Sequence, residues 1–295
     1  MHLKQTRSRA LAPTTRRGAA AGRVIVIVAV ALVVTVIAAV MHRRNAQRDA
    51  AAAPPVAQPV PADVMTAVAN VPDSALQRAA TQGAAIPVFT GDSDFANGKP
   101  VVLYIGAGYC PYCAAARWSM VAALSRFGTF SGLSLGSSSP TDVFANTPTF
   151  SFYKSTYTSA YIDFQPVEEA GEVQGLDGRY PPLETPTSAQ QALLQKYDAP
   201  PYVNAAGAGG IPFVMIGGKY MWSGSPFNPG VLTGKSQRAI AATLASGEGE
   251  AAQPILSNTN EIIATICAVD GGKPANVCSS DVIRRAIQTL PTKSP

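Results

Sequence analysis

Histidine is almost absent from this sequence of 295 residues, because its only two histidines are His2 and His42. Histidine is the most frequent general acid or base in enzymes and the commonest metal ligand. No nucleotide-binding loop, paired-carboxylate hydrolase site or serine triad can be recognised in the rest of the chain. The sequence therefore argues against a histidine-dependent hydrolase, and it predicts no bound cofactor.

Charge is also scarce, at 14% of the residues, and its net value of +5 is unevenly distributed. Residues 1–49 hold nine of the 23 Lys and Arg and one acid, so the other 14 basic and 17 acidic residues give a net charge of −3. The positive charge therefore belongs to the N-terminal segment. A basic surface for nucleic acid is not expected.

Residues 24–41 are an uncharged, strongly apolar run of 18 residues. A helix of that length would reach about 27 Å, enough for the hydrocarbon layer of a membrane. Six basic residues precede the run and three follow it, which favours a cytoplasmic N-terminus and an exported body. A cleaved signal peptide is the alternative, but His42-Arg43-Arg44 follows where a small-residue cleavage site would be expected. We therefore predict a single-pass anchor in the cell membrane.

The segment after the apolar run is a candidate linker, because residues 50–62 are small and rich in proline. Such a composition is typical of a semi-extended tether. The expected organisation is a cytoplasmic basic tail at 1–23, a transmembrane helix at 24–41, an Ala/Pro-rich linker at 42–62, and an extracytoplasmic domain at 63–295 that ends in a helical extension.

The body has the alternating pattern of an α/β fold. A continuous apolar run at 101–105 predicts a strand buried on both faces of a sheet. Residues 149–167 are rich in Phe, Tyr and Thr, and we expect extended structure with aromatic side chains packed on strand faces. The other expected elements are a helical segment at 63–82, broken at Pro72 and capped by Asp73 or Ser74, helices at 114–127 and 187–197, a strand–turn–strand at 212–222, and two or three C-terminal helices.

The motif Cys110-Pro111-Tyr112-Cys113 lies between the predicted buried strand and the helix after it. A cysteine at a helix N-terminus faces unpaired N–H groups and the positive end of the helix dipole, which stabilise a thiolate. Two intervening residues bring the second sulfur within disulfide reach, one helical turn away. We therefore expect Cys110 to be the exposed nucleophile and Cys113 the resolving thiol.

Zinc sites use the same cysteine spacing. Because both histidines lie in the N-terminal segment, only Cys267 and Cys278 remain as further ligands, and their spacing is not that of a second zinc-binding pair. No metal is therefore expected. A purely structural disulfide between Cys110 and Cys113 stays an alternative, although short bridges of this kind are commonly reducible.

A second segment, Gly210-Ile211-Pro212-Phe213-Val214, opens an apolar run that ends in Gly217-Gly218. Together with the cysteine motif it resembles the thioredoxin superfamily, over roughly residues 101–218 and with an insertion between the two halves. The resemblance implies a thioredoxin-like fold with extra C-terminal helices, in which Pro212 is cis and faces the cysteine pair. It also implies that Ile211 offers backbone groups to substrate, and we expect Tyr109 and Tyr112 to help bind it.

Over a longer span the chain resembles an uncharacterised family of membrane-anchored, thioredoxin-like bacterial and archaeal proteins. Two positions depart from the thioredoxin pattern: Tyr109 stands where Trp usually precedes the first cysteine, and Tyr104 stands where a buried acid is usual. The missing carboxylate bears on proton transfer from the resolving thiol. The segments that carry the longer resemblance are 104–118, 124–133, 146–153 and 210–214.

Cys267 and Cys278 would be exported with the body, where a disulfide is the default state. We expect a structural bridge between the last two helices, with a relay that exchanges with Cys110 and Cys113 as the alternative. The charged residues near the motif are expected to be ordinary. Arg117 is interpreted as a surface residue beside a packed Trp118, with the alternative that the two raise thiolate character or frame the cleft. Glu168, Glu169 and Glu172 are interpreted as a solvated loop face.

The sequence thus predicts a membrane-anchored, extracytoplasmic thiol–disulfide oxidoreductase that acts on protein thiols. A membrane partner that recycles the cysteine pair is implied. The direction of the reaction depends on the reduction potential, which residue types do not determine. The alternative is a non-catalytic protein-binding module on the same scaffold.

Overall fold

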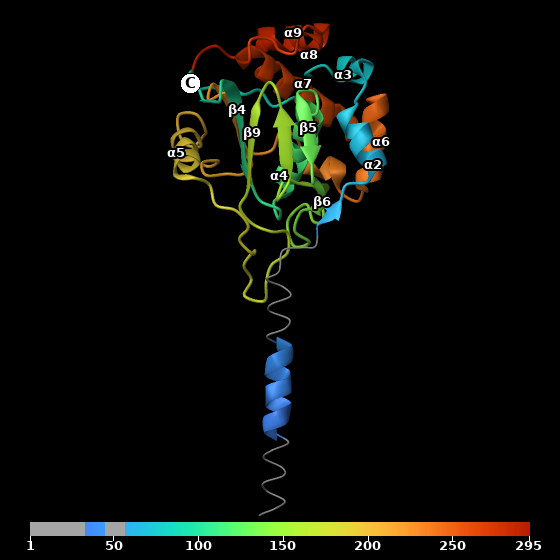
Figure 1. Ribbon diagram of the computed structural model, residues 1–295, viewed down its shortest axis with the longest axis vertical. Helices are drawn as coiled ribbons and strands as arrows, with labels where there is room; N and C mark the ends of the chain where they lie inside the picture. The colour runs from blue at the N-terminus through green and yellow to red at the C-terminus, as the bar shows by residue number, and fades with distance from the viewer. Residues whose placement is uncertain (1–32, 45–56) are drawn as a thin grey trace, which may run out of the picture. The chain divides into compact units, whose positions relative to one another are not determined.

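The computed structural model describes residues 33–44 and 57–295 (Figure 1). The chain divides after Ala50 into two units. In the first, residues 33–44 form a helix. The remainder of the predicted transmembrane segment, 24–32, lies outside the described residues, as do the predicted tail at 1–23 and most of the predicted linker. No helix within the described residues has both the length and the apolar character needed to span a membrane.

The second unit is built on a mixed sheet centred on β4 (Lys99–Gly106). This strand pairs in parallel with β9 (Asp163–Glu168) and antiparallel with β10 (Phe213–Ile216). Its continuous apolar run is buried throughout, which confirms the predicted strand with two covered faces. The sheet continues from β10 through β11 (Tyr220–Ser223) to β2 (Val88–Phe89), while β3 (Phe95–Ala96) forms a hairpin with the start of β4.

Helices cover both faces of this sheet. Val102 and Tyr104 point to the face packed by α4 (Pro111–Leu124) and α7 (Ala252–Val269). On the opposite face, apolar side chains of β4 and β10 pack with residues of α5 (Ser188–Tyr197). Figure 1 shows α5 on one side of the sheet and α2 and α6 on the other. This layered arrangement confirms the α/β class, because the side chains of each strand alternate between two cores.

An insertion between α4 and β9 forms two small sheets. One pairs β5 (Gly128–Ser131) with β8 (Thr156–Ser159). The other has the order β1-β6-β7, with β6 (Ser134–Ser137) between β7 (Pro148–Ser151) and β1 (Gln58–Pro59). The body therefore includes residues that the sequence assigned to the linker at 42–62: Gln58 and Pro59, and also Ala62, at which the next helix begins.

The helical segment before the sheet breaks at Pro72, into α2 (Ala62–Ala69) and α3 (Asp73–Ala79). The predicted break is confirmed, but the predicted cap at Asp73 or Ser74 is wrong: Pro72 itself is the N-cap, with no side-chain cap, and Asp73 and Ser74 lie inside the first turn. An acidic side chain there interacts favourably with the helix dipole.

Beyond the sheet, the chain forms a helical extension in which α7 is the central helix. Asn260 of α7 donates its Nδ2 hydrogens to the carbonyls of Leu76 and Ala80 at the end of α3, at 2.8 and 2.5 Å. These bonds satisfy carbonyls that a helix end leaves unpaired. A disulfide between Cys267 and Cys278, with Cα atoms 5.6 Å apart, ties α7 to the helix after it. The other elements here are η1 (Pro229–Leu232), α6 (Gln237–Ser246), α8 (Ala275–Cys278) and α9 (Asp281–Thr289).

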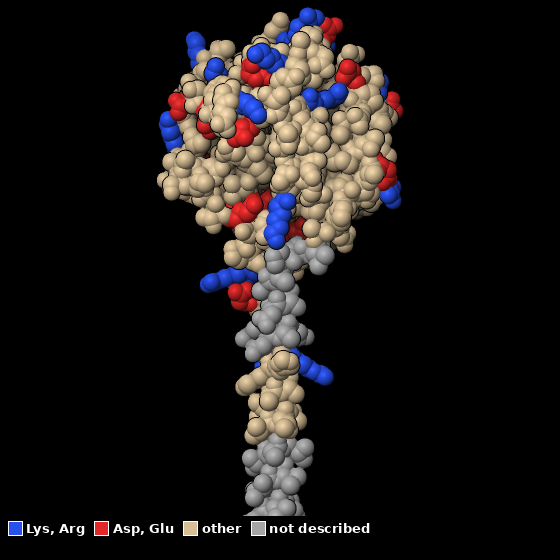
Figure 2. Space-filling view, viewed as in Figure 1, with Lys and Arg blue, Asp and Glu red and all other residues tan. Residues whose placement is uncertain are grey.

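Basic and acidic side chains are mixed on one face of the body. Figure 2 shows Lys and Arg interspersed with Asp and Glu on the face drawn, and no broad area of one sign among the coloured residues. This distribution fits the net charge of the body, which is slightly negative.

Candidate functional site: a dithiol at the start of helix α4

Cys110 is the N-cap residue of α4, four positions after the end of β4. Its Sγ accepts a hydrogen bond from the backbone N–H of Cys113, at 3.2 Å. Pro111 occupies the first helical position, where its missing N–H costs nothing. The sulfur of Cys110 is therefore held where backbone donors and the helix dipole both favour an anion.

The two cysteines are unbonded thiols with opposite electrostatic environments. A hydrogen bond from the Cys113 thiol, assisted by that residue's backbone N–H, lowers the pKa of Cys110 against the opposing effect of burial. Burial, together with the hydrogen bond to Cys110, raises the pKa of Cys113 well above its usual value. Cys110 is thus the better nucleophile. It is only 4% exposed, however, so its predicted exposure is wrong for this state of the site.

The segment around Pro212 meets the dithiol from the neighbouring strand. The Ile211–Pro212 peptide bond is cis, and Pro212 is buried just before β10. The Cys110 thiol donates a hydrogen bond to the carbonyl oxygen of Ile211, at 3.6 Å. Two motifs that lie about a hundred positions apart in the sequence therefore meet at one sulfur atom.

Tyr109 and Tyr112 anchor the loops around the dithiol. The Tyr109 ring stacks on Tyr180, with centroids 4.2 Å apart, and its carbonyl accepts a hydrogen bond from the backbone N–H of Ser139. Tyr112 makes an edge contact with Phe144 at 6.0 Å and is 39% exposed. Tyr112 is therefore the more accessible of the two tyrosines, and Tyr109 is partly buried.

A buried ion pair lies beneath the cysteines. Arg117 of α4 and Glu168 at the end of β9 are each 1% exposed, so their expected positions on the surface and in a solvated loop are both wrong. Arg117 Nε donates to Glu168 Oε1 at 2.8 Å, and Nη2 donates to Oε2 at 2.5 Å and to the Ala107 carbonyl at 2.8 Å. The positive charge of Arg117 lowers the pKa of both thiols.

Two positional signals could have identified this pair. Arg117 follows Cys113 by four positions, so both side chains lie on the same face of α4. Glu168 ends a strand that runs parallel to β4, and the ends of parallel strands meet at one edge of a sheet. From the sequence, an effect of Arg117 on the thiolate was only the alternative to a surface position, and Glu168 was assigned to a loop rather than to the end of a strand.

Tyr104, for which the sequence resemblance implied a missing buried acid, lies in β4. It is fully buried, and the Arg117 guanidinium lies 5.6 Å from its ring centroid. Gly106 borders both the Tyr104 hydroxyl and the dithiol. A Cβ atom at Gly106 would collide with Tyr104 Oη and would lie 3.0 Å from Cys113 Sγ. Only glycine fits at that position, and the hydroxyl and the sulfur approach each other across it.

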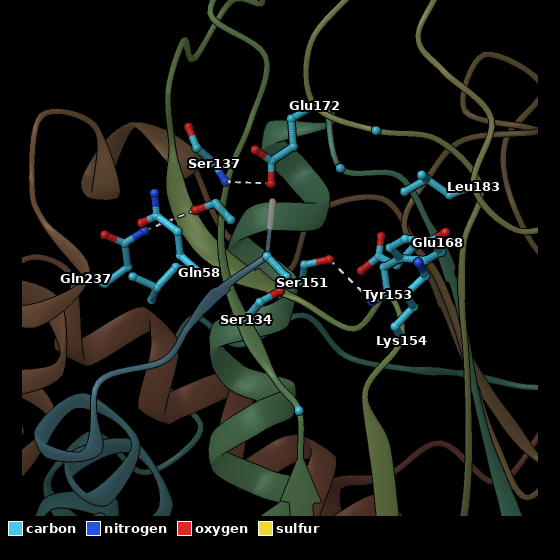
Figure 3. A pocket seen from close by; sticks show the side chains of 16 residues that line it. Gln58, Ser134, Ser137, Ser151, Tyr153, Lys154, Glu168, Glu172, Leu183 and Gln237 are labelled. Carbon is cyan, nitrogen blue, oxygen red and sulfur yellow. Dashed lines mark hydrogen bonds between the residues drawn. The ribbon is translucent and has the colours of Figure 1, made fainter. Parts of the chain in front are cut away.

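A pocket of about 730 Å³ with a mixed polar and apolar lining adjoins this site through Gly108 and Glu168. Glu172 accepts a hydrogen bond from the backbone N–H of Ser137 at 3.1 Å, and Figure 3 shows Glu168 and Lys154 across the pocket from it. A Cβ atom at Gly108 would lie 3.0 Å from Cγ of Glu172, so glycine makes room for that side chain. Burial raises the pKa of Glu172.

The described part of the chain contains no group of three or more His, Cys, Asp or Glu residues that could hold a metal ion. The disulfide also uses both thiols that a zinc site with Cys110 and Cys113 would require. The structure thus brings Cys110, Cys113, Tyr109, Tyr112, Ile211 and Pro212 together, and it keeps Cys267 and Cys278 in a separate bridge.

One comparison with known proteins identifies the family. The model of a family described as Domain of unknown function (DUF929) matches residues 87–268. The chain belongs to this family. The matched region runs from just before β2 to near the end of α7, so it includes the dithiol, Pro212 and the Arg117–Glu168 pair. No curated protein and no solved structure matches the chain. Its function must therefore be argued from the site itself.

Proposed function

We propose that this DUF929 protein is a thiol–disulfide oxidoreductase that acts on protein thiols through Cys110 and Cys113. The observation that carries the proposal is the position of the Cys110 sulfur. It sits at the N-terminus of α4, accepts the Cys113 N–H at 3.2 Å, and lies 3.6 Å from the carbonyl oxygen before a cis-proline. A packing cysteine requires none of these features, whereas a thiolate nucleophile benefits from the first two.

The reaction follows from the two thiol environments. The Cys110 thiolate attacks one sulfur of a substrate disulfide, forming a Cys110–substrate bond and releasing the other substrate sulfur as a thiol. Cys113 then loses its proton and attacks Cys110, forming the Cys110–Cys113 disulfide and releasing the second substrate thiol. Two electrons pass from the dithiol to the substrate. Run in reverse, the same steps oxidise a substrate dithiol.

The proposed fold is thioredoxin-like. Its support is the β4–α4–β9 unit, in which two parallel strands are joined across a helix that begins at a Cys-x-x-Cys motif. The cis bond before Pro212, and the contact of its preceding carbonyl with Cys110, are the second support. Ile211 would then present backbone groups to a bound segment of substrate, with Tyr109 and Tyr112 beside it.

We further propose that residues 24–41 anchor the protein in the cell membrane, with the body outside the cytoplasm. The charge asymmetry around the apolar run supports that orientation. The Cys267–Cys278 disulfide supports an oxidising compartment. A membrane redox partner would then renew the dithiol or the disulfide after each cycle.

Trapping of substrates tests the proposal. Replacing the resolving thiol, Cys113→Ala, should leave Cys110 joined to substrate sulfur, so that reducible adducts accumulate with proteins in cells. The matched control is Cys110→Ala/Cys113→Ala, which should trap nothing. If neither variant forms an adduct, with cellular proteins or with a purified disulfide-linked peptide, the catalytic proposal is wrong.

A non-catalytic binding module remains the second candidate, favoured by exposed apolar side chains near the dithiol. Tyr112, in the first turn of α4, is 39% exposed, and Val143, next to its ring partner Phe144, is 73% exposed. The reactivity of Cys110 separates the two candidates. In the reduced protein, a catalytic Cys110 reacts with iodoacetamide at pH values where an ordinary thiol is protonated, while an inert one does not.

A further inference from the structure

Two buried hydrogen-bond donors near Cys113 have no partner among the described residues. They are the hydroxyl of Tyr104 and the Nη1 group of Arg117. Both side chains are essentially inaccessible to solvent, at 0 and 1% exposure. A buried donor without an acceptor costs free energy, so its retention needs an explanation in another state of the molecule.

Both donors lie on the side of the dithiol where Cys113 is buried. The Tyr104 hydroxyl and the Cys113 sulfur border the same Gly106, which has no side chain between them. Arg117 is one helical turn after Cys113 on α4, and its guanidinium lies 5.6 Å from the Tyr104 ring centroid. The remaining Arg117 nitrogens are held by Glu168 and the Ala107 carbonyl, so the orientation of the side chain is fixed.

Cys113 is the acceptor that this arrangement lacks. As a thiol it is a weak acceptor, but it must become a thiolate to attack the mixed disulfide at Cys110. An anion that forms in a buried site is stabilised most by donors that are already oriented before the charge develops.

We propose that Tyr104 Oη and Arg117 Nη1 form a thiolate-binding pair that stabilises Cys113 during resolution of the mixed disulfide. The inference rests on the proposed function. In this step the Cys113–Cys110 bond forms as the Cys110–substrate bond breaks, and the electron pair of the broken bond leaves with the substrate sulfur. The proton lost by Cys113 is balanced by the proton gained by the departing substrate thiol.

The pair differs in kind from a buried carboxylate, because it donates hydrogen bonds and accepts no proton. Burial raises the pKa of Tyr104 well above its usual value, so its phenol stays protonated. The ionisable groups that act on Cys113 are Cys110 and Arg117 from α4, Tyr104 from β4, and Glu168 from β9 through its pairing with Arg117. Arg117 lowers the pKa of the Cys113 thiol, and burial and Cys110 raise it.

The direct test is the pKa of Cys113 in the full-length Cys110→Ser protein. With Cys267 and Cys278 joined, Cys113 is then the one free thiol among the three cysteines that remain, and the carbon-13 shift of its Cβ against pH reports its ionisation. Adding Tyr104→Phe should raise this pKa by about one unit, a roughly tenfold loss of thiolate at a given pH. Arg117→Lys, which keeps the charge but not the fork of donors, should raise it as well.

The matched control is Tyr157→Phe, which removes a partly buried hydroxyl that donates to the Leu124 carbonyl at 2.8 Å. Tyr157→Phe should lower stability without changing the pKa of Cys113. Tyr104→Phe should change the pKa without loss of stability, because the hydroxyl that it removes has no partner. A Cys113 pKa that is unchanged in Tyr104→Phe, or changed equally in both variants, overturns the inference.

A kinetic measurement separates this inference from the proposed function. In the protein with both cysteines, Tyr104→Phe should slow release of substrate from the mixed disulfide roughly tenfold, while attack by Cys110 keeps its rate. If the wild-type protein exchanges no disulfides but the pKa shift is observed, the proposed function and the role of the pair in resolution fail, and only the binding of the Cys113 thiolate by the pair stands. If exchange occurs and resolution is unaffected by Tyr104→Phe, the pair fails and the function stands.

Discussion

The molecule holds two pairs of cysteines that are equally buried and chemically different. Cys110 and Cys113 are 4 and 0% exposed, and Cys267 and Cys278 are 3 and 6% exposed. The first pair consists of free thiols at a helix N-terminus, and the second is a disulfide between two helices. Burial alone therefore does not distinguish a candidate reactive site from a structural bridge.

The surroundings of the sulfur atoms make the difference. Cys110 has a backbone donor at 3.2 Å, a thiol partner one turn away and a carbonyl at 3.6 Å from another strand. Arg117 adds a buried positive charge that acts on both thiols. Cys267 lies near the C-terminal end of α7, where the helix dipole disfavours a thiolate. The comparison predicts that each pair responds differently to mutation.

The largest effect should follow from loss of the nucleophile. Cys110→Ser should reduce exchange with a disulfide-linked peptide at least about a thousandfold, because no other thiol of the chain is activated. Single-turnover kinetics with the purified protein measures this. The control is Cys267→Ser/Cys278→Ser, which should exchange at the wild-type rate. Substantial exchange by Cys110→Ser would make the two pairs functionally alike and contradict the account.

The next largest effect concerns the buried Arg117–Glu168 ion pair, which lies beneath Cys110 and Cys113 only. Arg117→Met leaves Glu168 charged and unpaired in the core, so the free energy of unfolding should fall by about 3–5 kcal/mol. The pKa of Cys110 should rise, because a positive charge that lowers it is lost. Urea denaturation measures the first effect and the pH dependence of alkylation measures the second. Arg117→Met/Glu168→Leu should recover much of the stability, and an equally unstable double variant would refute this explanation.

Removal of the bridge should affect stability and leave chemistry intact. Its closed loop, with a sequence separation of 11, corresponds to about 3 kcal/mol in the chain-entropy model of disulfide stabilisation. Cys267→Ser/Cys278→Ser should therefore unfold at lower urea concentration by that amount. A change in the reduction potential of Cys110–Cys113 in this variant would instead favour the relay hypothesis.

A smaller effect concerns the pH dependence of the free energy of unfolding, which we expect to be independent of the ionisation of the dithiol. Burial raises the pKa of Glu261, on α7, from 4.5 to about 7. Because the folded protein binds this proton more tightly, its contribution to stability is complete below about pH 4.5 and is lost as the pH rises to about 7. The loss should amount to roughly 2–3 kcal/mol.

Glu261→Gln should abolish this slope, so that the variant is more stable than wild type at pH 8. Urea denaturation at pH 5 and pH 8 provides the measurement, and alkylation of Cys110 should be unchanged. A parallel slope in both proteins would assign the pH dependence to another group.

Much of the fold could be predicted from local signals. The apolar run of β4, the break at Pro72 and the start of α5 each follow from a short pattern, and Thr187 and Gln190 form the capping box that opens α5. The start of the body was missed, because Gln58 and Pro59 join a sheet through pairing with Leu135 and Ser134. Such long-range pairing leaves no signal in the strand itself.

In the candidate site, too, local patterns were predicted and features that depend on distant residues were missed. The cysteine motif and the Ile-Pro step were recognisable because each is a contiguous pattern. Arg117 and Glu168 were misassigned, since burial of a charged residue depends on a partner that only the folded chain supplies. Tyr104 was noticed as a missing acid, but its unpaired hydroxyl beside the dithiol could be recognised only in three dimensions.

The central claim is that the two cysteine pairs differ in redox behaviour. It is tested most directly by equilibrating the protein with defined thiol–disulfide buffers and mapping which cysteines are modified at each potential. The account predicts that Cys110 and Cys113 interconvert reversibly between dithiol and disulfide, while Cys267 and Cys278 remain joined throughout. A Cys110–Cys113 pair that never forms a disulfide, or that resists reduction as strongly as the other pair, would contradict it.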